Sequence, residues 1–188
     1  MSRLHTPHAL SEAGRIAPPP ALMPFAQSME AALAQSARLV TDGIVASLPD
    51  ADTLLAALPP GALAGGAGTY TRHLIHADPF GRFSVMLLVW RPGQASPVHG
   101  HRAWCAYRVL RGTMTERHYH WNPATRHAAL AHTVTREAGD TFSVPAGLRH
   151  IHQLSNTGDE VAVSLHVYGV EQHQIATGVN LLVDTAPT

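Results

Sequence analysis

Hydrophobic residues recur at helical spacing in the first third of the chain. Intervals of four or seven residues separate the large apolar side chains Phe25, Met29, Leu33, Val40 and Ile44. Apolar positions spaced in this way line one face of a helix. The pattern therefore predicts an amphipathic helix, or two in succession, from Pro24 to about Ser47.

A second, shorter apolar run lies between Pro49 and Pro59 and contains Leu54, Leu55 and Leu58. Asp50 or Asp52 is suited to cap its N-terminus, because an aspartate side chain accepts hydrogen bonds from the first free amides of a helix. The glycine-rich stretch 61–68 would end this helix and form the loop into the next region.

Beyond Tyr70 the pattern changes to short apolar or alternating stretches separated by Gly, Pro, Asn and Asp. These stretches predict strands over Phe83–Trp90, Ala103–Leu110, Thr113–Trp121, Ala128–Val134, Thr141–Val144, His150–Leu154 and Val161–Tyr168. Many short strands with such punctuation are typical of an antiparallel sandwich or barrel. We expect a mainly β fold with an extended arm over 1–22, a helical cover over 23–68 and a β-barrel over 69–188.

Composition narrows the class of protein. The chain has 188 residues, 45% of them hydrophobic and 14% charged, which suits one domain with a sizeable core. Thirteen acidic residues balance thirteen basic ones, so we expect no nucleic-acid partner. The apolar run Val85–Trp90 is too short to cross a membrane, and the N-terminus lacks the apolar core of a secretory signal. One cysteine, Cys105, excludes a disulfide framework, and we expect a cytoplasmic protein.

Fourteen histidines are unusual, and two of them, His99 and His101, sit two residues apart. On a strand, both imidazoles would point to one face and could hold one metal; the alternative is a pair of half-exposed strand histidines. With Gly93 before them and Gly112 after them, the spacing resembles the first motif of the cupin superfamily. Cys105 then stands where most cupins carry a glutamate ligand.

A second segment resembles the second cupin motif, which supplies one more histidine ligand. Counting from Gly147 favours His150, whereas counting back from Asn156 favours His152. Both histidines have the same strand parity, so periodicity does not choose between them. The run from His152 to Asn156 is similar to the metal-histidine segment of thiol dioxygenases. We therefore expect His152 as the third ligand, with His150 as the alternative.

Ser164, His166 and Tyr168 alternate with three apolar residues on the last strong strand and would share one face. They could line the solvent side of an edge strand. Alternatively, they could form a relay into the barrel, in which Ser164 orients His166 and His166 orients the hydroxyl of Tyr168.

Two further polar features precede and interrupt the strands. Tyr70-Thr-Arg72 leads into the first strand; a lone arginine is usually on the surface, but an inward one could clamp a carboxylate through its planar fork. His118 and His120 form another pair two residues apart. No glycine spacing surrounds them, so we expect exposed strand residues.

Taken in order from Tyr70 to Gly169, these motifs resemble the cysteine dioxygenase family, which are cupins with one non-haem iron. The resemblance implies a cupin-type barrel, also called a double-stranded β-helix or jelly roll. It implies L-cysteine and O2 as substrates, cysteine sulfinic acid as product and Fe(II) as cofactor. The metal ligands it implies are His99, His101 and His152.

The resemblance also implies roles around the metal. Arg72 would take the substrate carboxylate with help from Tyr70, and Tyr168 would hydrogen-bond the substrate or oxygen, oriented by His166 and Ser164. Cys105 resembles the cysteine that forms a thioether with the active-site tyrosine in animal members of the family, whereas many bacterial relatives carry glycine there.

Two alternative functions follow from the same motifs. The first is a dioxygenase for another small thiol carboxylate such as 3-mercaptopropionate, although such relatives tend to carry glutamine at the position of Arg72. The second is a non-catalytic cupin that binds a metal or a small acid.

Overall fold

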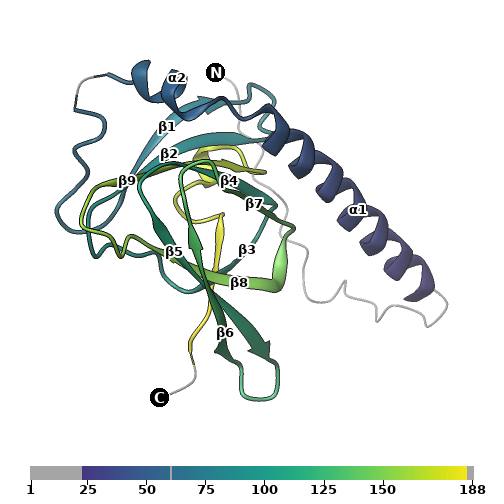
Figure 1. Ribbon diagram of the computed structural model, residues 1–188. Helices are drawn as coiled ribbons and strands as arrows, with labels where there is room; N and C mark the ends of the chain where they lie inside the picture. Colours follow the sequence, from purple (N-terminus) through teal and green to yellow (C-terminus); the bar gives the residue numbers. More distant parts are fainter. Residues whose placement is uncertain (1–22, 60, 186–188) are drawn as a thin grey trace, which may run out of the picture. The chain divides into compact units, whose positions relative to one another are not determined.

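The computed structural model describes residues 23–59 and 61–185 (Figure 1). The chain divides into two compact units, one ending at Gln35 and the other beginning at Ser36. Helix α1 (Met23–Ser47) passes from the first unit into the second. Every strand of the described residues lies in the second unit, which therefore carries the whole barrel.

A short helix, ten strands and one turn of 3₁₀ helix follow α1 in the described part of the chain. They are α2 (Ala51–Ala56), β1 (Thr71–Ala77), β2 (Ser84–Trp90), β3 (His99–His101), β4 (Cys105–Arg111), β5 (Met114–Asn122), β6 (His127–Arg136), β7 (Thr141–Val144), β8 (Gly147–Ser155), β9 (Ala162–Tyr168), η3 (Gln172–Gln174) and β10 (Asn180–Leu182). Of the two expected caps, Asp50 is the N-cap of α2: its side chain accepts a hydrogen bond from the Thr53 amide at 2.9 Å.

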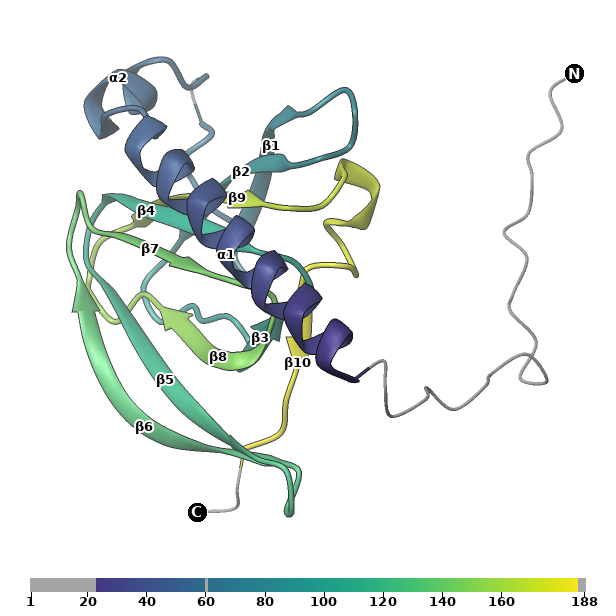
Figure 2. The ribbon, with the colours of Figure 1, turned by 90° about the vertical axis from the view of Figure 1, so that its right-hand side faces the viewer.

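The strands form two five-stranded sheets that face each other (Figures 1 and 2). One sheet has the order β1-β2-β9-β4-β7 and the other the order β10-β3-β8-β5-β6, and every pairing within them is antiparallel. Non-consecutive neighbours such as β9 and β4 give the double-stranded β-helix of cupins. The predicted fold class, a cupin-type antiparallel barrel with an N-terminal helix, is confirmed.

The apolar run of β2 is continuous because both faces of its sheet are covered. Met86, Leu88 and Trp90 belong to the core between the sheets, whereas Leu87 and Val89 belong to a second cluster on the opposite face. The leucines of the α2 region pack against that second cluster. Helix α2 thus covers the outer face of the sheet, and the inner face of β2 is free to line the barrel interior.

The structure corrects several predictions about the elements. The expected helix or two over Pro24–Ser47 is one helix, and three strands, β1, β3 and β10, were not predicted as strands in their own right. Arg72 does not precede the first strand but lies within β1. The arm expected over 1–22 lies outside the described residues, and the division into a cover and a barrel at residue 69 stays a prediction.

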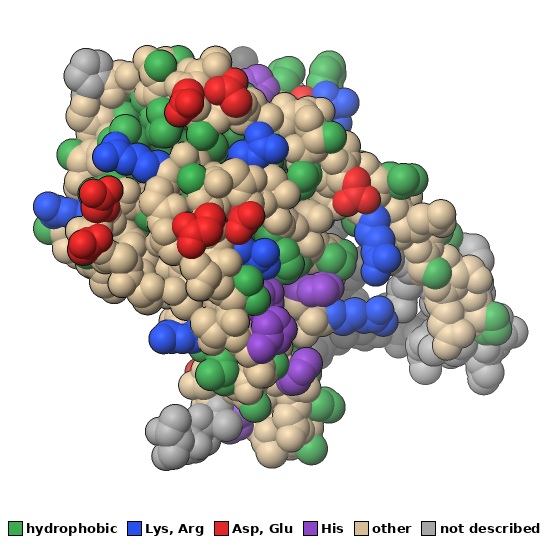
Figure 3. All heavy atoms as spheres, in the orientation of Figure 1, with side chains coloured by type: hydrophobic (Ala, Val, Ile, Leu, Met, Phe, Trp, Pro, Cys, Tyr) green, Lys and Arg blue, Asp and Glu red, His purple; other side chains and the backbone are tan. Residues whose placement is uncertain are grey.

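The surface drawn in Figure 3 mixes acidic and basic side chains and forms no large patch of one sign on that face. Among the described residues, no helix combines the length and the apolar character that a membrane crossing needs.

Candidate metal centre

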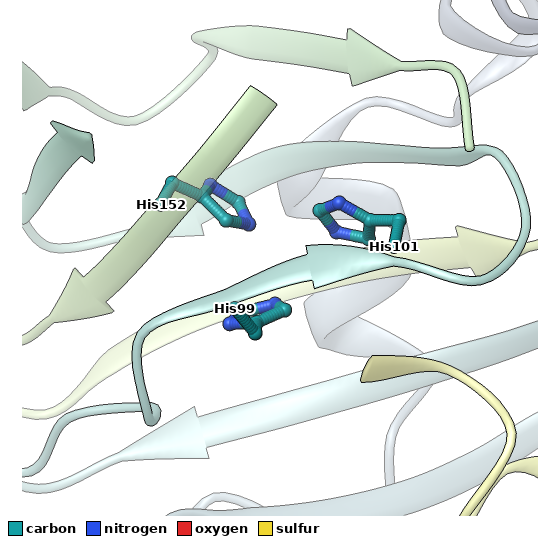
Figure 4. A group of neighbouring side chains, drawn as sticks. All are labelled: His99, His101 and His152. Atoms are coloured by element: carbon teal, nitrogen blue, oxygen red, sulfur yellow. The ribbon is translucent and has the colours of Figure 1, made fainter. Parts of the chain in front are cut away.

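Three buried histidines converge from two neighbouring strands, as Figure 4 shows. His99 and His101 come from β3, and His152 comes from β8, where it is paired directly opposite His99. Their possible ligand atoms all lie within 4.8 Å of one another, and the three residues are 6%, 1% and 3% exposed. A cluster of this kind can hold one transition-metal ion.

Glycine makes this convergence possible. A Cβ atom on Gly100 would lie 2.6 Å from the carbonyl oxygen of Gly147, too close for any other residue. Gly147 itself has a φ of +114°, in the region that favours glycine. The two glycines let β3 and β8 approach where their register shifts, between His99 and His101. Gly100, between the two histidines of the first motif, and Gly147, in the second motif, therefore have a structural reason.

The structure separates His150 and His152 by burial. His152 is buried with the other two histidines, whereas His150 is exposed. Equal strand parity does not mean equal burial here, because β8 pairs irregularly with β3.

The remaining ring nitrogens show which atoms are free for a metal. Nδ1 of His99 lies 2.9 Å from the carbonyl oxygen of Pro97, to which it donates, and Nδ1 of His152 lies 2.6 Å from Oε1 of Glu116. In both residues Nε2 is left free to bind a metal ion between the three histidines. Nδ1 of His101 has no hydrogen-bond partner among the described residues.

Burial keeps His99 and His101 uncharged. It lowers the pKa of His99 to about 3, with a further contribution from His152, and holds the pKa of His101 well below its ordinary value of 6.5 for the same reasons. Neutral imidazole is the form that binds metal, so these residues fit a divalent transition-metal ion.

Beside the cluster, Ser164, His166 and Tyr168 form the predicted relay. Oγ of Ser164 lies 2.9 Å from Nε2 of His166, and the hydroxyl of Tyr168 lies 3.1 Å from Nδ1 of the same ring. The alternative of a solvent-facing edge strand is wrong: β9 is the central strand of its sheet, and all seven of its residues are buried. Burial lowers the pKa of His166 to about 3, so its ring is neutral.

Trp90 sets the direction of this relay and was not anticipated from the sequence. Its indole Nε1, which can only donate, is 2.9 Å from Oγ of Ser164. Among the described residues, Ser164 Oγ has only Trp90 and His166 as partners, so its proton goes to Nε2 of His166. His166 then donates from Nδ1 to the oxygen of Tyr168, which leaves the Tyr168 proton free for another acceptor.

One pocket brings the predicted binding residues to the histidines. Tyr70, Arg72, Cys105 and Tyr168 line it together with the histidine cluster. Tyr70 stacks on Trp90, with ring centroids 4.1 Å apart, and Cys105 is paired with Tyr168 across β4 and β9.

Arg72 is only partly inward, contrary to the expectation of a buried clamp. It lines the pocket, and its Nη1 donates to the carbonyl oxygen of Ile175 at 3.2 Å, yet the residue remains exposed. Arg72 is exposed because its strand, β1, lies at the edge of its sheet.

Glu116 is the functional candidate that sequence reasoning missed. It is 0% exposed, and its carboxylate contacts His152, Arg136 and Tyr107. His118 lies beside it, with Nε2 3.3 Å from Oε2, so the expectation of an exposed His118 is wrong, whereas His120 is exposed as expected. Burial alone would raise the pKa of Glu116, but hydrogen bonds from the histidines outweigh it and hold the pKa below its usual range.

The sequence could have pointed to Glu116 through strand parity. Met114 and Glu116 lie two residues apart on β5 and are both fully buried, so an inward methionine predicts an inward glutamate. A carboxylate on the core side of a strand is a signal because it must be paired there.

Comparison with known proteins supplies the family. The family model for cysteine dioxygenase type I matches residues 66–177, more than half of the chain. Human cysteine dioxygenase type 1 is 31% identical over 103 residues, and the zebrafish (Danio rerio) protein of the same name is 30% identical over 104 residues. Each match covers 53% of this chain and 50% of the relative, so the chain spans about half the length of the curated relatives it matches.

Solved structures with a similar fold include an uncharacterised conserved protein with a double-stranded β-helix domain from Klebsiella pneumoniae. It is 18% identical, with a TM-score of 0.47, and the match covers 74% of this chain and 98% of that one. A cupin superfamily protein from Desulfitobacterium hafniense is 13% identical, with a TM-score of 0.43 and coverage of 61% and 93%. The family match, which includes both β3 and β8 with their three buried histidines, is the finding that decides: this chain belongs to the cysteine dioxygenase type I family.

Proposed function

We propose that the chain is a thiol dioxygenase that converts L-cysteine into cysteine sulfinic acid. The thiol R–SH and O2 combine to R–SO2H, so both oxygen atoms end on sulfur and no further reductant is needed. The observation that carries the proposal is the convergence of three buried imidazoles in the same pocket as Arg72 and Tyr168. Membership of the cysteine dioxygenase type I family supports it.

His99, His101 and His152 would hold the metal, for which we propose Fe(II). Imidazole suits iron among the first-row metals, and three neutral imidazoles leave the positive charge of the ion uncompensated by its protein ligands. A cationic centre favours an anionic thiolate, because a coordinated thiol loses its proton. When bound, Fe(II) would supply the redox chemistry that lets O2 react with the sulfur.

Arg72 would bind the substrate carboxylate and fix its orientation. The contact from Nη1 to the Ile175 carbonyl holds one corner of the guanidinium and leaves other N–H groups for the carboxylate. Tyr70 lines the same pocket, and its stacking on Trp90 holds its ring in place. Together they would select thiols that carry a carboxylate.

Tyr168 would donate its proton to the substrate or to oxygen. The hydrogen bonds from Trp90 through Ser164 and His166 leave the Tyr168 hydroxyl hydrogen free. Burial, reinforced by the nearby Cys105, raises the pKa of Tyr168, so the hydroxyl stays protonated and acts as a donor.

Cys105 and Tyr168 would become joined by a thioether. They are direct partners across β4 and β9, and burial raises the pKa of the Cys105 thiol, so it is not a thiolate nucleophile at neutral pH. The bond forms between sulfur and a ring carbon, with loss of the S–H and one ring C–H hydrogen. The two electrons and two protons released must pass to an oxidant, and O2 with the metal centre would supply that capacity.

Oxygen uptake tests the proposal. The full chain, loaded with Fe(II), is supplied in turn with L-cysteine, 3-mercaptopropionate and cysteamine, and products are identified by mass spectrometry. We expect the fastest uptake with L-cysteine and a sulfinic acid as product. Faster turnover of 3-mercaptopropionate would refute the substrate assignment, and tightly held zinc without uptake from any thiol would favour a binding protein.

A further inference from the structure

A buried carboxylate lies directly behind one of the three histidines. Oε1 of Glu116 is 2.6 Å from Nδ1 of His152, and both residues are at most 3% exposed. The two side chains come from neighbouring strands, β5 and β8, so the contact is part of the sheet rather than of a loop.

The other carboxylate oxygen of Glu116 is occupied from elsewhere. Oε2 accepts hydrogen bonds from Nε of Arg136 at 2.7 Å and from the hydroxyl of Tyr107 at 2.9 Å, with Nε2 of His118 at 3.3 Å. Arg136 balances the charge and is held in turn over the ring of Phe142. These contacts fix the orientation of the carboxylate and leave Oε1 to face His152.

This arrangement determines which nitrogen of His152 carries the proton. A carboxylate bound to Arg136 is an acceptor at both oxygens, so His152 must donate from Nδ1. Nε2 of His152 then presents its lone pair. The two partner histidines lack such a contact: His99 donates to the neutral carbonyl of Pro97, and Nδ1 of His101 has no partner among the described residues.

We propose that Glu116 is a positioning residue for the metal centre. It holds His152 in the tautomer that can bind metal. It also places a negative charge beside this ligand without binding the metal itself. The cluster consists of His99, His101 and His152, so the ligand set itself has no carboxylate. The inference rests on the part of the proposed function that assigns His152 to the metal, and not on the reaction or its substrate.

Substitution of Glu116 by glutamine gives a sharp expectation, because the amide has one acceptor and one donor end. Arg136 and Tyr107 both donate to the Oε2 position and therefore select the amide oxygen there. The NH2 group then faces Nδ1 of His152 and forces the proton to Nε2. We expect metal affinity to fall by roughly 10–100-fold, the usual effect of losing such a supporting contact.

The matched control is Glu137→Gln. It removes the same charge from an exposed carboxylate that, among the described residues, accepts a hydrogen bond only from Thr113 Oγ1 at 2.8 Å. The full chain is freed of metal and titrated with Co(II) against a chromophoric chelator, for wild type, Glu116→Gln and Glu137→Gln. Nitrogen-15 NMR of the metal-free proteins reports the tautomer of His152, whose signals are identified by their loss in His152→Asn.

We expect Nδ1–H in the wild type, Nε2–H with weakened Co(II) binding in Glu116→Gln, and wild-type behaviour in Glu137→Gln. Unchanged Co(II) affinity in Glu116→Gln would overturn the proposal. If that variant does not fold, an Nε2–H tautomer of His152 in the wild type would overturn it equally. Co(II) binding and tautomer are measured without thiol or oxygen, so a chain that consumes no oxygen would refute the dioxygenase while leaving this inference intact.

Discussion

Trp90→Phe should weaken the relay to Tyr168 while leaving Ser164, His166 and Tyr168 themselves in place. Trp90 is 1% exposed, and its indole N–H donates to the hydroxyl of Ser164, which gives its own proton to His166. Phenylalanine keeps an aromatic ring beside Tyr70, which now stacks at 4.1 Å, but it has no N–H. Ser164 then loses the donor that polarises its hydroxyl, so its own hydrogen bond to His166 weakens.

The magnitude follows from one neutral hydrogen bond, whose net contribution is about 1 kcal/mol. If that energy is lost from the productive form of the relay, kcat with cysteine should fall by roughly fivefold. The smaller ring also leaves unfilled space in a buried site, which should lower the free energy of unfolding by roughly 1–3 kcal/mol.

A double-mutant cycle separates these effects. Trp90→Phe, Ser164→Ala and the double variant are compared by kcat, by kcat/KM and by the free energy of unfolding. Because both variants break the same relay, their effects on kcat should fall short of additive by about 1 kcal/mol. Effects on kcat that add to within about 0.5 kcal/mol would refute the reasoning, since they would show that Trp90 acts through packing alone.

Three further predictions concern the site itself. His152→Ala should abolish iron retention measured by metal analysis, whereas His150→Ala should retain iron; the reverse result would reassign the third ligand. If Cys105 and Tyr168 become linked, turnover with iron and oxygen should produce a second band on a denaturing gel that Cys105→Ser lacks, and a single band with a free thiol after many turnovers would exclude the link. Arg72→Ala should lower kcat/KM for cysteine by about tenfold, the loss of one charge-assisted hydrogen bond, with iron content unchanged; because Arg72 is exposed, the effect belongs at the low end of the range for such bonds, and wild-type activity would make Arg72 a surface residue.

The elements that could be predicted from the sequence are those whose signal is local. The run Val85–Trp90 is apolar on both faces because α2 covers one of them, and it was recognised as a strand. The sequence pattern does not predict strand β1, because its polar residues and its exposure at the sheet edge give it no regular alternation. Strand parity alone predicts that His99 and His101 lie on one face of a strand, and the structure places them together.

Contacts between strands that are distant in sequence could not be predicted in the same way. Glu116 carries no motif, and its partners Tyr107, Arg136 and His152 lie 9, 20 and 36 residues away. Trp90 and Ser164 are separated by 74 residues and meet only because β2 and β9 are neighbours. Such partners follow from sheet topology, which hydrophobic periodicity does not specify.

Labelled oxygen gives the most direct test of the central claim that the chain adds O2 to the thiol of cysteine. The iron-loaded protein is supplied with L-cysteine under ¹⁸O2, and the product is analysed by mass spectrometry. The account predicts cysteine sulfinic acid with both sulfinate oxygens labelled. Cystine as the only product, or a sulfinate that takes an oxygen from unlabelled water at the moment it is formed, would contradict it.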